Sequence, residues 1–280
     1  MPIKTTVITG ATSGIGKATA MALAAQDHAV YLLVRNVIKD EAVKQEIITQ
    51  TGNKHVCIIQ CDLADLQSVR DAVAELSQKL MAINILINNA GAGFSERQVS
   101  RDGFEMTFAI NHLGHFLLTT GLMPLLERGQ ARIINVSSEG HKLGKPNFDD
   151  LQSAQNYSSF KAYGMAKLFN IYFARSLAQK FGDKGILAFS LHPGAVNSSF
   201  ADKLKGFDKT LMKLARPFMI TTQQGAETSI YLATAPRLDK FNGCYFKKKK
   251  VAKTAVIAQD AAAQEKLWLI SEKLISKSVI

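Results

Sequence analysis

A tyrosine and a lysine four residues apart are the side chains best suited to acid–base chemistry. Tyr163 and Lys167 lie in a stretch with helical character, and this spacing places both on one face of a helix. A nearby ammonium group stabilises a phenolate and lowers the pKa of the phenol, which ordinarily titrates at about 10. We expect Tyr163 to exchange a proton with a carbonyl or alcohol oxygen and Lys167 to hold a cofactor ribose. Taken alone, such a pair is common by chance.

Two further polar residues are candidates for the same chemistry. Ser138 follows the predicted strand Arg132–Val136, and its hydroxyl is suited to binding a substrate oxygen and stabilising developing charge. Asn111 lies in the long predicted helix Gly103–Leu126, where a buried amide needs hydrogen-bond partners. A bound water leading to Lys167 would supply one. The alternatives are a strand-end cap for Ser138 and a helix kink at Asn111.

A glycine-rich turn lies near the start of the chain. It reads TGATSGIG, follows the predicted strand Ile3–Thr9 and opens the predicted helix Ile15–Gln26. Glycines let a backbone approach a pyrophosphate closely, and the first amides of the next helix point at the phosphates. A plain strand-to-helix turn is the alternative. The residues expected to contact a dinucleotide here are Gly10, Thr12, Ser13, Gly14, Ile15 and Gly16.

The residues after the second predicted strand indicate which dinucleotide binds. An acidic residue at the end of this strand would bind the ribose hydroxyl of NAD, and Val34 and Arg35 offer none. Arg35 instead provides a fixed cation suited to a 2′-phosphate, with Lys17 as a weaker helper. The sequence therefore favours NADP(H), and an exposed surface arginine is the alternative.

Polar and small residues follow the third and fourth predicted strands. Asp62, next to Leu63, is placed to accept a hydrogen bond from the adenine amino group. Asn89, Ala90 and Gly91 leave room for the adenosine ribose. Each of these residues could equally be an ordinary turn residue.

Short apolar runs alternate with helical stretches along the chain, which predicts βαβ units and a parallel sheet covered by helices on both faces. We expect a single doubly wound α/β Rossmann domain over residues 1–280, because no Pro- or Ser-rich linker divides them. The further predicted strands are Ala29–Val34, His55–Gln60, Ile83–Ile87 and Ile186–Leu191. The further predicted helices are Ile38–Gln50, Leu66–Leu80 and Tyr157–Phe181.

The composition is that of a basic globular protein. Of 280 residues, 47% are hydrophobic and 20% charged, and the net charge is +11. Such a charge suits nucleic acid, an anionic membrane or a phosphorylated cofactor. The sequence has no zinc-finger spacing and no RNA-binding signature. We therefore expect an anionic cofactor and no nucleic-acid partner.

Cysteine usage and the apolar segments bear on location. The chain has three cysteines, Cys57, Cys61 and Cys244. An odd number of cysteines fits free thiols in a reducing compartment. A metal site with His55 is the alternative, and we expect no metal because no second ligand cluster follows. The sequence shows no signal peptide and no run of about 20 apolar residues. We expect a cytoplasmic protein without an integral membrane segment.

The motifs together resemble the short-chain dehydrogenase/reductase family over nearly the whole chain. They are TGATSGIG, NNAG from Asn88 to Gly91, NVSS ending at Ser138, YGMAK from Tyr163 to Lys167 and HPG from His192 to Gly194, in family order. The resemblance implies a doubly wound sheet. It implies a catalytic tetrad of Asn111, Ser138, Tyr163 and Lys167, with Pro193, Gly194 and Val196 bordering the nicotinamide.

Within the family the chain is similar to the retinol dehydrogenase-like branch. The segments that carry this similarity are DGFEMTFAINHLGHFLLT, FDDL and LWLISEKL. The branch acts on retinoids, steroids or lipid aldehydes with NADP(H), which are the substrates and cofactor that the resemblance implies. The chain departs from it at Ala166, where serine is common, and at Ser198, where threonine is usual. We also expect it to lack the N-terminal anchor of many membrane-bound members.

An amphipathic segment follows the HPG motif, over residues 199–220. Its apolar residues recur at intervals of three and four, which predicts one apolar helical stripe. They are Phe200, Leu204, Phe207, Leu211, Leu214 and Phe218. We expect a mobile substrate lid; a helix packed into the core or a homodimer contact, and a peripheral membrane contact, are the alternatives. We expect the lysine run Lys247–Lys250 to be solvated.

These observations predict an NADP(H)-dependent oxidoreductase that interconverts a carbonyl and an alcohol on a small, largely apolar substrate. Two alternatives remain. One is an NADP-binding regulator without turnover, and the other is a reductase of a conjugated carbon–carbon double bond.

Overall fold

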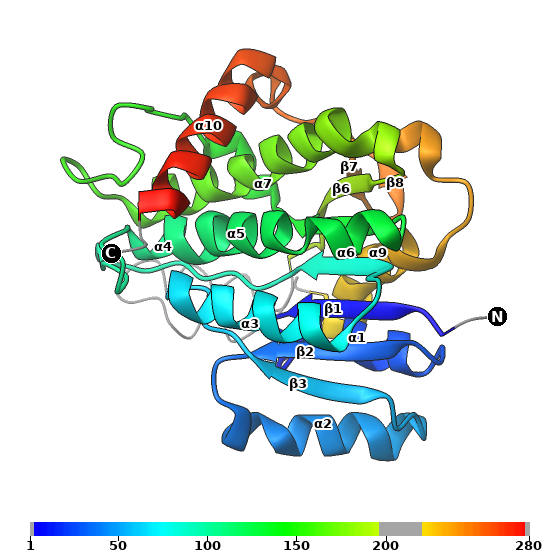
Figure 1. The fold of residues 1–280 in the computed structure, drawn as a ribbon. Helices are drawn as coiled ribbons and strands as arrows, with labels where there is room; N and C mark the ends of the chain where they lie inside the picture. The colour runs from blue at the N-terminus through cyan, green and yellow to red at the C-terminus, as the bar shows by residue number, and fades with distance from the viewer. Residues whose placement is uncertain (1–2, 196–219, 278–280) are drawn as a thin grey trace.

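The computed structural model describes residues 3–195 and 220–277. This part of the chain forms an eight-stranded sheet in the order β3-β2-β1-β4-β5-β6-β7-β8, in which all pairs are parallel except the antiparallel β7–β8 pair (Figure 1). The strands are β1 Thr5–Thr9, β2 Ala29–Val34, β3 Val56–Gln60, β4 Ile85–Asn88, β5 Arg132–Val136, β6 Leu187–His192, β7 Tyr245–Lys247 and β8 Lys250–Val251. The predicted doubly wound α/β fold is confirmed.

Helices cover both faces of this sheet. They are α1 Gly14–Ala24, α2 Val37–Thr51, α3 Leu66–Lys79, α4 Met106–Phe108, α5 Gly114–Gly121, α6 Met123–Arg128, α7 Ser159–Phe181, α9 Thr222–Thr234 and α10 Ala261–Lys277. The short 3-10 turns are Glu139–Leu143, Gly182–Lys184, Asp239–Phe241 and Val256–Gln259. From β1 the strands are added in one direction as far as β3, and the chain then crosses back to place β4 on the other side of β1. Open α/β sheets bind ligands beside such a reversal of strand order.

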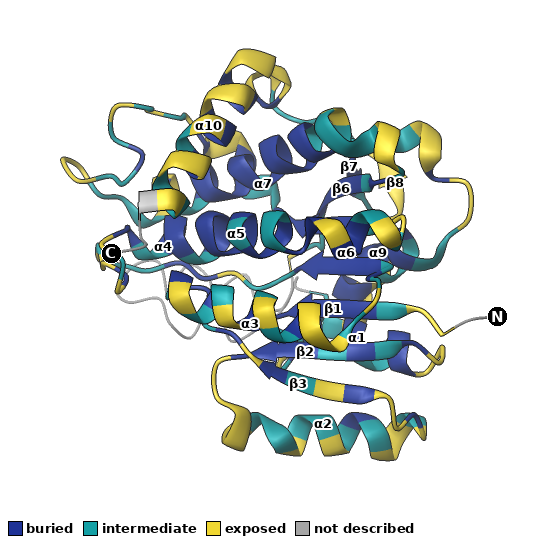
Figure 2. Ribbon diagram, in the orientation of Figure 1, coloured by how far each residue is buried: buried dark blue, intermediate teal, exposed yellow. Residues whose placement is uncertain are grey.

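Neighbouring residues of one strand belong to different cores. Val7 of β1 belongs to the cluster that contains Phe116 of α5 and Phe173 of α7, whereas Ile8 belongs to the cluster that contains Leu23 of α1. Side chains alternate across a strand, so a strand buried on both faces must be apolar throughout. Figure 2 shows the result, with α7 largely buried and α2 and α10 exposed along one side.

The C-terminal helix α10 forms an additional layer over α5 and α7. Its indole Trp268 lies 4.9 Å from the ring centroid of Phe116 and 5.9 Å from that of Phe173. Ser271, one turn further, lies 2.8 Å from Nε2 of the buried His112. These contacts fix the LWLISEKL segment against the body of the protein.

The predicted long helix Gly103–Leu126 forms in part, as three helical segments joined by a π-helical turn and a break. Helix formation begins at Met106, where the carboxylate of Glu105 accepts hydrogen bonds from the amides of Thr107 and Phe108. A π-helical turn then occupies Ala109–Leu113, and a second break separates α5 from α6. Helical propensity indicates where a helix forms. Whether its hydrogen bonds change locally to the π-helical pattern depends instead on the surrounding packing.

The lysine run forms the turn between β7 and β8. Lys248 and Lys249 have φ angles of 51° and 61°, as a two-residue hairpin turn requires. Lys247 lies 3.6 Å from Glu139, and Lys249 lies 2.8 Å from Glu227. Lys248, Lys249 and Lys250 are exposed and Lys247 is half-buried, so the run is largely solvated as predicted, and two of its lysines form surface ion pairs.

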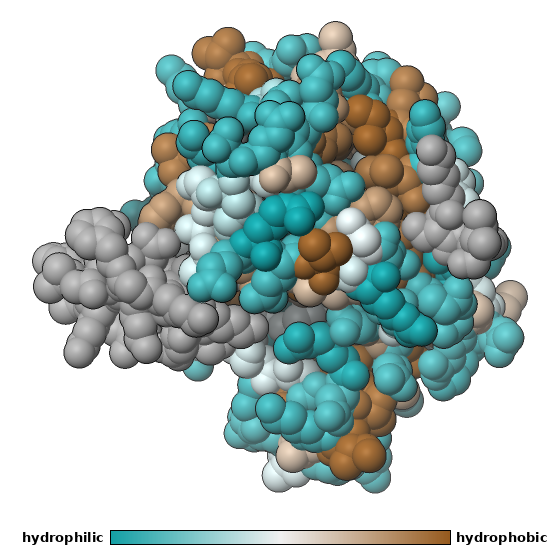
Figure 3. All heavy atoms as spheres, turned by 90° about the vertical axis from the view of Figure 1, so that its left-hand side faces the viewer, coloured by the Kyte–Doolittle hydropathy of each residue, from teal (hydrophilic) through white to brown (hydrophobic). Residues whose placement is uncertain are grey.

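The parallel strands point their carboxyl ends toward one side of the molecule, on the left of Figure 1. Figure 3 views the molecule from this side, where hydrophilic residues predominate and apolar groups form separate patches. Among the residues described, no helix is both long enough and apolar enough to cross a membrane.

Candidate active site

The four proposed catalytic side chains come from three elements that meet near the carboxyl edge of the sheet. Ser138 follows β5, Asn111 lies in the π-helical turn, and Tyr163 and Lys167 lie one turn apart on α7. The 3-10 turn after Ser138 packs closely on α7, since a Cβ on Gly140 would lie only 3.4 Å from the Tyr163 ring. The structure therefore brings these residues together.

The Tyr163 phenol and the Ser138 hydroxyl share a hydrogen bond. The backbone amide of Gly140 donates to Ser138 Oγ over 3.1 Å, which fixes the hydroxyl beside the ring. Burial raises the pKa of Tyr163 to about 12, and the hydrogen bond with Ser138 opposes this shift. The expected lowering of the Tyr163 pKa is therefore wrong for the protein alone, because desolvation outweighs the other effects.

Lys167 is deeply buried, with 3% of its surface exposed. Its Nζ lies 5.4 Å from the centroid of the Tyr163 ring and donates to the carbonyl of Val136 over 3.1 Å. Burial lowers the pKa of Lys167 to about 8. A buried amine that titrates near neutrality is suited to passing protons.

Asn111 has one polar atom in use and one available. Its Nδ2 donates to the carbonyls of Ala92 and Thr107 over 2.7 and 2.8 Å. Its Oδ1 is buried and has no hydrogen-bond partner among the described residues. A Cβ on Gly91 would lie 2.8 Å from this oxygen and 3.0 Å from Lys167 Nζ. Gly91 therefore leaves space between Asn111 and Lys167, as a bridging water would need. Asn111 also lies in the π-helical turn Ala109–Leu113.

His115 is a buried residue that sequence reasoning missed. Its Nδ1 lies 3.2 Å from the carbonyl of Asn111, and its Nε2 lies 2.9 Å from Thr9 Oγ1. Because a carbonyl only accepts, Nδ1 carries the proton, and burial lowers the pKa of His115 to about 4, which keeps the ring neutral. The ring therefore joins Asn111 to the glycine-rich turn. The helical spacing of Asn111 and His115 was the available signal.

The glycine-rich turn has the geometry that a pyrophosphate needs. Gly10 and Gly14 have φ angles of 65° and 55°, in the left-handed region. A Cβ on Gly10 would lie 2.9 Å from Ala90 Cα, which only glycine avoids. Ser13 occupies the N-cap of α1, and within the described chain its hydroxyl makes no capping bond. The first amides of α1 thus remain available to an anion.

The residues proposed near the adenosine have structural partners. The side chain of Asn89 donates to the carbonyls of Thr9 and Gly10 over 2.9 and 3.2 Å, so it holds the glycine-rich turn. Asp62 Oδ1 accepts from the amide of Ala64 over 3.0 Å, and the neighbouring Leu63 is buried. The turn interpretation therefore holds for Asn89 and Asp62, beside any contact with a cofactor.

Arg35 and Lys17 differ in availability. Arg35 is exposed directly after β2 and has neither an ion pair nor a hydrogen-bonded side-chain partner in the described part of the protein. Lys17 instead forms an ion pair of 2.6 Å with Glu46. Since Val34 is buried, Arg35 is the charged group best placed to meet a 2′-phosphate, and the helper role for Lys17 is not supported.

Pro193 and Gly194 follow β6, and Gly194 has a φ of 106°. Val196 and the proposed lid lie outside the described residues, except for Ile220, whose amide donates to the carbonyl of Ala195 over 2.8 Å. Within the described ranges, no group of three His, Cys, Asp or Glu residues is placed to hold a metal ion, and all three cysteines are free thiols.

Comparison with known proteins decides the family. The short chain dehydrogenase family matches residues 4–208. The chain belongs to this family of oxidoreductases. Mouse retinol dehydrogenase 12 is 40% identical over 276 residues, which cover 98% of this chain and 87% of the mouse protein. Mouse retinol dehydrogenase 11 is 38% identical over 280 residues, covering 100% of this chain and 88% of its own.

Solved structures share the fold. An uncharacterized protein from Mycobacterium paratuberculosis is 29% identical, with a TM-score of 0.78 over 98% of this chain and 93% of its own. The NADPH-bound carbonyl reductase from chicken fatty liver is 21% identical, with a TM-score of 0.68 over 91% and 100% of the two chains. The 3-ketoacyl-(acyl-carrier-protein) reductase of Brucella melitensis, complexed with NADH, is 22% identical, with a TM-score of 0.68 over 87% and 95%. The family binds a nicotinamide cofactor, and these two structures differ in which one they hold.

Proposed function

We propose that this protein is an NADP(H)-dependent oxidoreductase that interconverts a carbonyl and an alcohol on a largely apolar substrate. The observation that carries the proposal is the hydrogen-bonded Ser138–Tyr163 pair, with Lys167 and Asn111 behind it. NADP(H), when bound, supplies or accepts the hydride. The residues of the chain orient the substrate oxygen and move its proton.

The contacts of these residues support a proton path. In the reducing direction Tyr163 donates its phenolic proton to the carbonyl oxygen, while Ser138 donates a hydrogen bond to the same atom and stabilises its developing charge. Lys167 returns a proton to Tyr163, and its own proton is replaced through a water held by Asn111 Oδ1. The buried Oδ1, which has no partner within the described ranges, and the space at Gly91 support this relay.

The preference for NADP(H) rests on charge. Among the described residues Arg35 has no ion-pair partner. Neither Arg35 nor Val34 is an acid that would repel a 2′-phosphate or bind the ribose hydroxyl of NAD. Steady-state kinetics with both cofactors tests this assignment, with Arg35→Ala as the diagnostic variant.

The apolar character of the substrate rests on two exposed side chains beside Tyr163. Phe160, one turn earlier on α7, is 44% exposed, and Leu143 is 59% exposed. Leu143 packs against α7 at Gly164, the residue after Tyr163, since a Cβ on Gly164 would lie 3.1 Å from Leu143 Cβ. Exposed apolar groups beside a proton donor suit a lipid-like carbonyl. The similarity to retinol dehydrogenases supports a retinoid-like aldehyde or alcohol.

One panel separates this proposal from its alternatives. Wild-type protein and Tyr163→Phe are assayed with NADPH against aldehydes, ketones and enones of matched length. The proposal predicts reduction of apolar aldehydes or ketones by wild-type only. Reduction confined to the enone double bond would favour the alternative reductase, and NADPH binding without any turnover would favour a regulator.

A further inference from the structure

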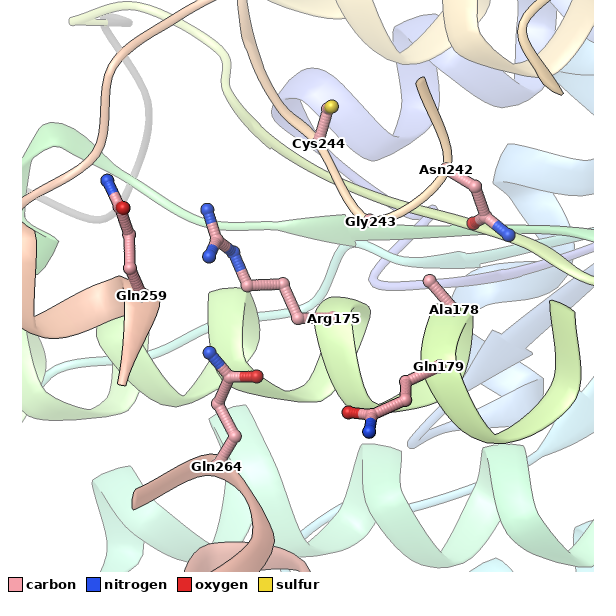
Figure 4. Close-up of a pocket in the computed structure, with 8 residues that line it drawn as sticks. All are labelled: Arg175, Ala178, Gln179, Asn242, Gly243, Cys244, Gln259 and Gln264. Atoms are coloured by element: carbon pink, nitrogen blue, oxygen red, sulfur yellow. The ribbon is translucent and has the colours of Figure 1, made fainter. Parts of the chain in front are cut away.

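A pocket of about 500 Å³ opens on α7 far from the candidate active site. Arg175, which extends into it, follows Tyr163 by twelve residues, or about 18 Å along the helix. Figure 4 shows the Arg175 side chain rising from α7 toward the loop that carries Cys244 and toward Gln259. The residues that line the pocket are Arg175, Ala178, Gln179, Asn242, Gly243, Cys244, Gln259 and Gln264.

This pocket lies near the amino ends of the strands, whereas the cofactor turn lies at their carboxyl ends. Asn242 Oδ1 accepts from the amide of Ala188, at the start of β6, over 2.7 Å, and the amide of Gly243 donates to the carbonyl of Ala188 over 2.8 Å. The pocket therefore adjoins the amino ends of β6 and β7. The glycine-rich turn, Ser138 and Pro193 all follow the carboxyl ends of their strands.

Arg175 is a cation that forms no ion pair with any described residue. In the described part of the chain it makes neither an ion pair nor a hydrogen bond, and its Nε is buried without a partner. The comparably buried Arg132, in contrast, donates to the carbonyl of Leu232 over 3.0 Å and has Asp239 nearby. A buried, unpaired donor on a charged group destabilises a protein unless a ligand or water meets it.

The titratable neighbours of Arg175 among the described residues form no ion pair with it. Asp260, which interacts electrostatically with Tyr172, accepts from the amide of Ala263 over 3.0 Å. Tyr172 donates its hydroxyl proton to the carbonyl of Ile257 over 2.8 Å, and burial raises its pKa to about 12. Burial also raises the pKa of the Cys244 thiol, which keeps it protonated at neutral pH. The described lining residues include no acid. Three of them are glutamines, of which Gln264 already donates through Nε2 to the carbonyl of Ala258 over 3.1 Å.

We propose that this pocket binds an oxyanion, the carboxylate or phosphate group of a small molecule, with Arg175 as its anchor. A guanidinium presents a planar fork of donors that matches both groups, and charge-assisted hydrogen bonds of this kind are strong. Gln179 and Gln264 reach the pocket from α7 and α10, so the ligand would lie between these two helices. The assignment is independent of the proposed redox reaction.

Protection of Cys244 from alkylation tests the proposal. Cys244 lines the pocket and Cys57 is exposed on β3, so each molecule carries its own control. The rate of carbamidomethylation at each thiol is measured by mass spectrometry in phosphate, in acetate and in sodium chloride of equal ionic strength. We expect saturable protection of Cys244 and none of Cys57. Protection by phosphate alone identifies a phosphate site, and by acetate alone a carboxylate site.

Two substitutions locate the ligand. Gln179→Glu places a carboxylate on an exposed lining position, where it competes for Arg175, and should weaken protection by about tenfold or more. Gln78→Glu adds the same charge at an exposed position on α3 and should change nothing. The proposal is wrong if phosphate and acetate protect Cys244 no better than chloride does, or if Gln179→Glu is protected as fully as Gln78→Glu.

Discussion

Gly91→Ala places a single methyl group between two proposed catalytic residues. The new Cβ would lie 2.8 Å from Asn111 Oδ1 and 3.0 Å from Lys167 Nζ, where ordinary contact begins at 3.4 Å. The neighbours must therefore move by several tenths of an ångström, at about 1–3 kcal/mol of stability. A bridging water would lose its space. Because misplacement on this scale has large effects in active sites, we expect turnover to fall by about 10- to 100-fold.

Gly121→Ala is the matched control for this prediction. Its Cβ would lie 3.0 and 3.1 Å from the methyl groups of Val73, a similar degree of crowding away from the site. Thermal unfolding, NADPH affinity and the turnover number are measured for both variants with an apolar aldehyde. We expect comparable losses of stability and a loss of turnover in Gly91→Ala alone. If Gly91→Ala turns over as fast as Gly121→Ala, the proposed relay between Asn111 and Lys167 is wrong.

Three further predictions concern the cofactor, the substrate and pH. Arg35→Ala should lower the ratio of kcat/KM for NADPH to kcat/KM for NADH by about tenfold or more. Lys17→Ala should change this ratio much less, because the Lys17 side chain is already paired with Glu46. Phe160→Ser should reduce kcat/KM for long-chain aldehydes more than for short ones; an equal effect in the control Ile38→Ser, an exposed apolar residue of α2, would contradict an apolar wall. The free energy of unfolding should fall as the pH drops from about 6.5 toward 4, because burial lowers the pKa of His115 to about 4 and the unfolded chain binds the proton first. Urea unfolding at several pH values checks this, and His115→Gln should flatten the slope.

The sequence was sufficient for the fold because central strands such as β4 are buried on both faces and the turns that follow the strands carry their own chemical signals. Gly10 and Gly14 needed left-handed φ angles, and the helical spacing of Tyr163 and Lys167 placed them on one face of α7. Ser138 could be assigned to the same edge because parallel strands end together.

Partners distant in sequence could not be predicted. The ion pair of Lys17 with Glu46 joins two helices, and nothing in the local pattern indicates it. The π-helical turn at Asn111 and the contact of His115 with Thr9 likewise depend on how α5 packs beside β1. Desolvation is also a property of the packed state, which explains why the Tyr163 pKa shifts opposite to the expected direction.

The central claim is that the Tyr163 phenol delivers the proton to a carbonyl oxygen. The most direct test is a single-turnover measurement of NADPH oxidation by an apolar aldehyde in Tyr163→Phe. Tyr231→Phe is the control, since this half-buried phenol on α9 has no hydrogen-bond partner among the described residues. We predict that Tyr163→Phe binds NADPH normally and reduces the aldehyde about 10²- to 10⁴-fold more slowly, with Tyr231→Phe unaffected. A Tyr163→Phe variant that reduces the aldehyde at the wild-type rate would contradict the account.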